Sequence, residues 1–205
     1  MYSIVIDKLR EVTPTKIICV GRNYVSHIKE LGNPMPQQMV VFCKPNSASA
    51  TQLHAEHLGD AIEYEGELCF IVEKGQFSAL GFGFDLTKRQ LQGELKRQGL
   101  PWERAKAFDG SAVFSQFVSL ADLPKQITFQ LSRNNRLVQS GDSQLMLYKP
   151  EEILSEVSRF MQLNDGDVIM TGTPEGVGPI TKGDHFSVKV LIGDQTVIKQ
   201  SWVTA

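Results

Sequence analysis

Short runs of apolar residues, separated by Gly, Pro and Asn, make up most of the chain. This spacing is typical of β-strands joined by turns. The runs predict strands over residues 16–20, 39–44, 62–73, 168–171, 185–192 and 195–203. Gly193 and Asp194 separate the last two runs, and this pair favours a β-hairpin turn.

Two windows have helical spacing instead. The window 87–97 begins with Thr87 and has Gln90 three residues later, which is the pattern of a capping box, and Gly99 follows it as a stop. The window 150–163 begins with a proline and two glutamates and repeats apolar residues on one face. With no repeat and no long linker, the sequence predicts one α+β domain, mostly β, over residues 1–205. Residues 1 to about 15 are expected to form an N-terminal extension.

Composition and charge narrow the classes of function. Hydrophobic residues are 41% of the chain, and 21 basic against 23 acidic side chains give a net charge of −2. We therefore expect neither nucleic acid nor an anionic membrane as a partner. The chain has no apolar run of about 18 residues and no leader pattern, so we expect a cytoplasmic protein. Three unpaired cysteines within apolar runs predict buried thiols, without a disulfide or a zinc site.

The run 62–73 carries the most informative polar pattern. Alternation along a strand places Glu63, Glu65 and Glu67 on one face, which then becomes apolar. The face is either solvated or the site of a hard cation such as Mg²⁺ or Mn²⁺, which prefers carboxylate oxygens. Asp85, expected after a glycine-rich turn at 81–83, is a candidate third ligand and equally a candidate helix cap.

Three further segments carry candidate chemistry. In a short helix that ends at Gly32, His27 and Glu30 would lie on one face and could act as a general base, or be ordinary surface residues. Lys106, between two alanines, could neutralise the acidic cluster or stabilise an oxyanion, although a surface lysine is the simpler interpretation. The glycine-rich loop 171–178 lacks the ending of a nucleotide-binding P-loop and suits a small carboxylate better.

Five motifs in order, GRNY…H..E, EYEGEL, DLTKR.LQ, G.PW..AK.FD and GD.I.TGTPEGVG, resemble the fumarylacetoacetate hydrolase family. The resemblance spans residues 16–185 and is strongest to small bacterial members and to the acylpyruvate hydrolase and oxaloacetate decarboxylase branch. It implies a β-rich fold built on a rolled, sandwich-like sheet with a few short helices. It also implies a homodimer with one Mg²⁺ or Mn²⁺ per subunit.

Matched motif by motif, the resemblance implies roles for individual residues. The metal ligands would be Glu65, Glu67 and Asp85. The catalytic groups would be His27, Glu30 and Lys106, with the first two forming a dyad on a lid. The substrate-binding residues would be Arg22, Tyr24, Gln92 and Thr173, with Arg22 and Tyr24 at the entrance. Arg89 also fits its motif, and we expect it to be a structural ion-pair partner. Gly66 departs from the pattern, because a bulkier residue is common between the two glutamates.

The resemblance implies a metal-dependent hydrolase that cleaves a C–C bond in acylpyruvates, such as fumarylpyruvate, to give pyruvate and a carboxylic acid. The same site could instead decarboxylate oxaloacetate, or act as a keto–enol isomerase or hydratase on a small 2-oxo dicarboxylic acid. A non-catalytic protein that binds a metal and a small acid is the alternative from another class. In each case the ligand is a small 2-oxo acid.

Overall fold

Two β-sheets form the body of the protein in a computed structural model that describes residues 1–205. The larger sheet has eight strands. Its order is β4 (Val40–Pro45), β3 (Lys16–Gly21), β15 (Val168–Met170), β9 (Gly66–Glu73), β10 (Gln76–Asp85), β11 (Ala112–Phe114) and β5 (Ser49–Ala50), with β12 (Val118–Ser119) also paired to β10. The smaller sheet has the order β14 (Arg136–Asp142), β13 (Ile127–Arg133), β17 (His185–Ile192) and β18 (Gln195–Val203).

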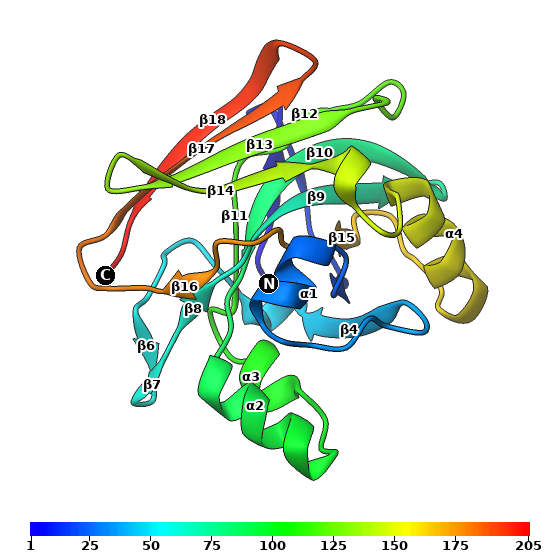
Figure 1. Ribbon diagram of the computed structural model, residues 1–205. Coiled ribbons are helices and arrows are strands. Elements are labelled where there is room, and N and C mark those ends of the chain that lie inside the picture. The colour runs from blue at the N-terminus through cyan, green and yellow to red at the C-terminus, as the bar shows by residue number, and fades with distance from the viewer.

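Short elements surround the two sheets. The paired short strands are β1 (Ile4–Ile6) with β2 (Arg10–Val12), β6 (Glu56–His57) with β7 (Asp60–Ala61), and β8 (Glu63–Tyr64) with β16 (Gly178–Pro179). The α-helices are α1 (Val25–Glu30), α2 (Arg89–Gln98), α3 (Glu103–Lys106) and α4 (Pro150–Phe160), and two 3₁₀ turns are η1 (Asn46–Ala48) and η2 (Ser143–Leu145). Figure 1 shows the smaller sheet across the top of the molecule and α2 with α3 at the opposite end. No helix is long and apolar enough to cross a membrane.

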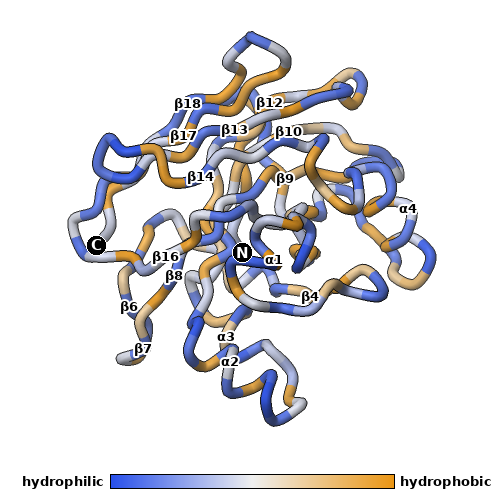
Figure 2. The backbone as a smooth tube through the Cα atoms, in the orientation of Figure 1, coloured by the Kyte–Doolittle hydropathy of each residue, from blue (hydrophilic) through white to orange (hydrophobic).

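The main core lies between the two sheets. Phe82 of β10 packs edge-on against Phe129 of β13, with ring centroids 5.2 Å apart, and Phe84 packs in the same way against Phe186 and Trp202. These contacts follow from strand alternation, because alternate residues of both strands point inward and are apolar: Ile127, Phe129 and Leu131 of β13, and Phe186, Val188 and Val190 of β17. Figure 2 shows the outcome, with hydrophobic stretches along the strands and a hydrophilic turn between β17 and β18.

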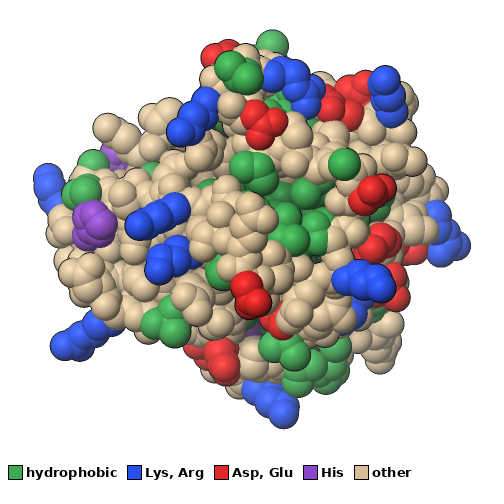
Figure 3. Space-filling view, turned by 90° about the horizontal axis from the view of Figure 1, so that it is seen from above, with side chains coloured by type: hydrophobic (Ala, Val, Ile, Leu, Met, Phe, Trp, Pro, Cys, Tyr) green, Lys and Arg blue, Asp and Glu red, His purple; other side chains and the backbone are tan.

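The outer surface carries charges of both signs. Seen from above, over the smaller sheet, basic and acidic side chains are both spread across the face in Figure 3. At the other end of the chain, the first fifteen residues pack onto the domain, because Ile4 and Ile6 of β1 are buried and Ile6 forms a bridge with Phe117.

The predicted strands are present, with one interruption. The run 62–73 is divided at Glu65 into β8 and β9, while the hairpin of β17 and β18 turns at Gly193 and Asp194 as predicted. Three long strands, β10, β13 and β14, were not predicted. Helix α4 ends at Phe160, earlier than expected, because Met161 is extended.

The predicted turn at 81–83 is wrong, since these residues lie in the middle of β10. Gly81 and Gly83 serve packing instead. A Cβ atom on Gly81 would lie 2.5 Å from the Phe117 ring, and one on Gly83 would lie 2.8 Å from Cys69 Sγ. Glycine here makes room for side chains of the neighbouring strands.

The predicted capping box at the start of α2 is also wrong. The helix begins at Arg89, and the Thr87 hydroxyl donates to the carbonyl oxygen of Asp85 and accepts a hydrogen bond from Lys106. The end of the helix follows the prediction more closely, because Gly99 adopts the left-handed conformation with φ of 65°.

Candidate active site

Three buried carboxylates meet at one point of the larger sheet. Glu65 lies between β8 and β9, Glu67 lies in β9, and Asp85 ends β10, which pairs antiparallel with β9. The backbone N–H of Asp85 donates to the carbonyl oxygen of Glu65 over 2.8 Å, and this fixes the register. One ligand oxygen from each residue lies within 4.8 Å of the others. The structure thus brings together the three residues that the sequence predicts as metal ligands.

Two lysines approach this acidic cluster. Lys106 of α3 places Nζ 3.0 Å from Glu65 Oε2 and 2.6 Å from Asp85 Oδ2. Burial alone would lower the pKa of Lys106, but these two carboxylates outweigh it and raise the pKa. Lys44 of β4 is fully buried, with Nζ 2.9 Å from Asp85 Oδ1, and it donates to the carbonyl oxygens of Ser111 and Lys106.

Lys44 was missed by the sequence reasoning. The available signal was a lysine directly after the apolar run 40–43 and immediately before Pro45. A charged side chain next to such a run must find partners when the strand is buried. Lys44 Nζ lies within ion-pair distance of Asp85 Oδ1, but the two atoms do not form a hydrogen bond. This buried carboxylate oxygen therefore has no hydrogen-bond donor and is available to a cation.

Arg89 is the third basic partner of the cluster. Its Nε donates to Glu63 over 2.8 Å, its Nη1 donates to Gln92 Oε1 over 2.9 Å, and its Nη2 pairs with Glu65. This is the ion-pair position expected for Arg89. Burial would raise the pKa of Glu65, but Lys106 and Arg89 overcome that effect and hold the pKa well below its ordinary value.

Glu67 lacks such compensation. It is 1% exposed, accepts one hydrogen bond over 2.7 Å from the backbone N–H of Gly172, and forms no ion pair. Burial and the neighbouring charges of Asp85 and Glu65 raise its pKa. A divalent cation among the three residues would offset this uncompensated charge, and oxygen ligands suit Mg²⁺ or Mn²⁺. The residues present therefore fit a divalent metal site.

A histidine and a glutamate of α1 form the expected pair beside the cluster. His27 Nδ1 lies 3.0 Å from Glu30 Oε2, and Glu30 Oε1 accepts a hydrogen bond over 2.9 Å from the backbone N–H of Gly176. Gly176 has φ of 97°, and a side chain there would collide with the carbonyl oxygen of Val138. The glycine-rich loop is thus fixed against the dyad.

Thr173 of the same loop lines the pocket and accepts a hydrogen bond over 2.8 Å from Gln139 Nε2. Gln139, which the sequence reasoning missed, also accepts from the backbone N–H of Gly66 over 2.9 Å. A Cβ atom on Gly66 would lie 2.8 Å from Phe82 and 2.9 Å from Gln139 Oε1. Glycine between the two glutamates therefore reflects close packing in this protein.

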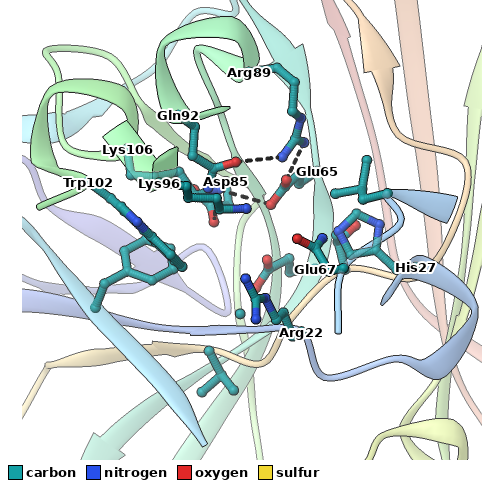
Figure 4. A pocket seen from close by; sticks show the side chains of 16 residues that line it. Arg22, His27, Glu65, Glu67, Asp85, Arg89, Gln92, Lys96, Trp102 and Lys106 are labelled. Atoms are coloured by element: carbon teal, nitrogen blue, oxygen red, sulfur yellow. Dashed lines mark hydrogen bonds and ion pairs between the residues drawn. The ribbon is translucent and has the colours of Figure 1, made fainter. Parts of the chain in front are cut away.

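The carboxylates, Lys106 and His27 line the pocket that is shown in Figure 4. Arg22 and Gln92 line it, as expected, and so do Lys96 and Trp102, which were not predicted.

The expected place of Tyr24 at the entrance is wrong. Its side chain is 2% exposed and packs in the main core, where its hydroxyl donates to the carbonyl oxygen of Asp142 over 3.2 Å. Tyr24 is the N-cap residue of α1, and its side chain joins the main core, whereas the Arg22 side chain lines the pocket.

Comparison with protein families agrees with this arrangement. The family model described as fumarylacetoacetate (FAA) hydrolase C-terminal matches residues 16–200. The chain belongs to the fumarylacetoacetate hydrolase family. Its β-rich fold, with two sheets and a few short helices, is the fold expected from that family, and the protein is an enzyme of this family with a candidate divalent metal site.

Members of the family with names or structures are similar over nearly the whole chain. Oxaloacetate tautomerase YcgM of Escherichia coli is 36% identical over 85% of this chain and 87% of its own. The mitochondrial oxaloacetate tautomerase FAHD2 of rice, Oryza sativa subsp. japonica, is 39% identical over 86% of both chains. The fumarylpyruvate hydrolase of Pseudomonas aeruginosa, solved in complex with Mn²⁺ and pyruvate, superposes with a TM-score of 0.90, 28% identity, and coverage of 100% of this chain and 95% of its own.

Proposed function

We propose that this protein is a metal-dependent tautomerase that interconverts the keto and enol forms of oxaloacetate or a similarly small 2-oxo dicarboxylic acid. This proposal replaces hydrolysis as the first expectation, because the two relatives described above are oxaloacetate tautomerases at 36% and 39% identity. The observation that carries it is the position of Lys106 Nζ, 3.0 and 2.6 Å from two of the three carboxylates. A buried cation beside the proposed metal ligands would oppose negative charge on the keto oxygen of a 2-oxo acid bound there.

Keto–enol interconversion passes through an enolate, and the site is suited to stabilise one. The triad of Glu65, Glu67 and Asp85 would hold Mg²⁺ or Mn²⁺, and the bound ion would supply Lewis acidity toward the 2-oxo acid. Lys106 opposes the negative charge that develops on the keto oxygen, in a buried setting where such an interaction is strong. Thr87 holds the ammonium group of Lys106 in place, with its Oγ1 2.6 Å from Nζ.

The interconversion also needs a proton carrier at C3. His27 lines the pocket and is 5% exposed, and its Nδ1 faces Glu30. When the ring proton is on Nδ1, Nε2 is free to take a proton from C3 of the keto form. The protonated ring then returns this proton, directly or through water, to the oxygen on C2, which gives the enol and restores the neutral base. Glu30 orients the ring and is itself held by Gly176, so the base keeps one position.

Hydrolysis of an acylpyruvate is the second candidate, and the same dyad favours it. A base oriented by a carboxylate could activate water toward the distal carbonyl of a β-diketo acid. The similar Pseudomonas aeruginosa protein is a fumarylpyruvate hydrolase. Decarboxylation of oxaloacetate would require the same enolate stabilisation without a base.

A substrate panel tests the proposal. Purified protein would be assayed with oxaloacetate enol, acetylpyruvate and fumarylpyruvate, with Mg²⁺ or Mn²⁺ and with a chelator. We expect metal-dependent acceleration of oxaloacetate tautomerisation over the same buffer and metal without protein. The proposal is wrong if acylpyruvates are cleaved while tautomerisation stays at the background rate. No turnover of any member, with metal binding intact, would favour the non-catalytic acid-binding alternative.

A further inference from the structure

The basic side chains around the pocket fall into two groups. Lys44, Lys106 and Arg89 each form an ion pair with a carboxylate of the acidic cluster. Arg22 and Lys96 line the same pocket and have no carboxylate within ion-pair distance. The first group is neutralised within the protein, whereas the second group is not.

Arg22 is held in place by its own loop. It follows β3 with φ of 55°, a conformation that non-glycine residues seldom adopt. The next residue, Asn23, is fully buried and donates to the carbonyl oxygens of Tyr148 and Thr171, which fixes the loop on both sides. The Nε of Arg22 is shielded from solvent and has no hydrogen-bond partner. A buried donor without a partner costs free energy unless a ligand supplies an acceptor.

Lys96 reaches the pocket from the last turn of α2. Its Nζ lies 5.2 Å from the centroid of the Trp102 ring, and Trp102 packs edge-on against Phe42 at 5.9 Å. An aromatic face supports an ammonium group without neutralising it. Figure 4 shows Lys96 and Arg22 both directed into the pocket, Lys96 from α2 and Arg22 from the loop after β3.

The two unpaired cations also affect each other. Burial, followed by the positive charges of Arg22 and Arg89, lowers the pKa of Lys96 to about 8, and Lys106 acts in the same direction while Glu65 opposes it. The charged form of Lys96 is therefore less favourable than that of a free lysine, and a bound anion would stabilise it. The pocket is lined by four basic side chains and three carboxylates, so a bound divalent ion would leave a surplus of positive charge. A dianion would reduce this surplus more than a monoanion.

We propose that Lys96, together with Arg22, binds the carboxylate of the substrate that is remote from its 2-oxo acid end, and so selects dicarboxylic over monocarboxylic 2-oxo acids. This inference rests on the proposed function for the orientation of the substrate. The 2-oxo acid end belongs beside the triad and Lys106, whose partners are already in place. The remaining carboxylate then meets the two cations that have no partner in the protein.

A pair of matched ligands tests the inference. Oxaloacetate and 2-oxobutyrate have the same four-carbon chain and differ in a terminal carboxylate against a methyl group. Dissociation constants would be measured calorimetrically with freshly dissolved ligand and saturating Mg²⁺, for the wild type, Lys96→Met and Lys96→Arg. Arg97→Met is the control, because it removes one positive charge from the adjacent, exposed position of the same helix.

Lys96→Met should weaken oxaloacetate binding by about 10- to 100-fold, the usual size for loss of a charge-assisted hydrogen bond, and change 2-oxobutyrate binding by less than about twofold. Lys96→Arg should restore much of the preference, and Arg97→Met should leave it intact. Equal weakening of both ligands, or no weakening of either, would overturn the assignment. Calorimetry measures binding and does not require a tautomerase activity. A negative tautomerase assay would therefore refute the proposed function, whereas the role of Lys96 is judged only from the dissociation constants.

Discussion

Replacing Glu67 by glutamine tests whether the acidic cluster is built for a metal. Glu67 is the carboxylate without an ion pair, and the other two carboxylates and burial raise its pKa above the ordinary value of 4.5. A glutamine of the same shape can still accept the hydrogen bond from Gly172, and its amide can donate to the neighbouring carboxylates. Glu67→Gln should therefore stabilise the metal-free protein and remove a metal ligand.

The expected size follows from linkage. Each unit by which folding raises the pKa of an acid costs about 1.4 kcal/mol of stability once the pH is above both pKa values. Relief of a buried polar group that lacks sufficient partners is worth about 1 to 3 kcal/mol, which corresponds to an increase in Tm of roughly 2 to 12 °C for a chain of this size. The pH dependence of this contribution to stability is opposite to that of a typical carboxylate, whose pKa is lowered by folding. The penalty is absent below the unfolded value and grows as the pH rises, so the advantage of the Glu67→Gln variant over the wild type should shrink in acid.

Thermal unfolding with and without metal provides the assay. At about 100 times its Kd, a metal ion should stabilise the wild type by about 2.7 kcal/mol, which is roughly 5 to 11 °C in Tm. Glu67→Gln should lose most of this increase. The control is Glu63→Gln, the same chemical change at a partly exposed carboxylate paired with Arg89, and it should keep the increase. A Glu67→Gln variant with lower metal-free stability and an undiminished metal response would refute the reasoning.

The remaining predictions concern the base, the packing and the pH response. His27→Ala should slow turnover about 10²- to 10⁴-fold and keep the metal-induced rise in Tm; an unchanged rate would exclude His27 as the base. Gly81→Ala should cost about 1 to 3 kcal/mol in urea unfolding, because its Cβ would lie 2.5 Å from the Phe117 ring. Gly93→Ala, with space for a methyl group inside α2, should gain about 0.5 to 1 kcal/mol. Because Lys96 loses its charge as the pH rises through about 8, the affinity for oxaloacetate should fall over that range, and Lys96→Met should reduce this fall.

Local patterns predicted those elements whose signals lie within a few residues. Alternation gave β17 and β18 with their hairpin turn, and Gly99 marked the end of α2. The strand β10 was missed because its central glycines, Gly81 and Gly83, usually indicate a turn. Their role depends on Phe117 and Cys69, which come from other parts of the chain, and no local pattern shows that contact.

The residues of the candidate site likewise include some that the sequence predicts and some that it does not. Residues inside ordered motifs, such as the three carboxylates, the dyad and Lys106, could be named from the sequence, and the structure brings them to one pocket. Lys96 lies in a segment whose local sequence does not distinguish it from a surface lysine, and the apolar run before Lys44 indicates burial but not its partner. Tyr24 was placed wrongly because its motif gives proximity to Arg22 along the chain but not the direction of its side chain.

By itself, the sequence determined the residue chemistry: alternation set which glutamates share a strand face, and the order of the motifs set the family. Only the tertiary structure decided which charges compensate one another. Ion pairs between β4, β10, α2 and α3 join residues that are distant in sequence, and these pairings leave Glu67, Arg22 and Lys96 without an ion-pair partner. Electrostatic interactions depend on distance and burial, which are fixed when the two sheets pack and β9 pairs with β10.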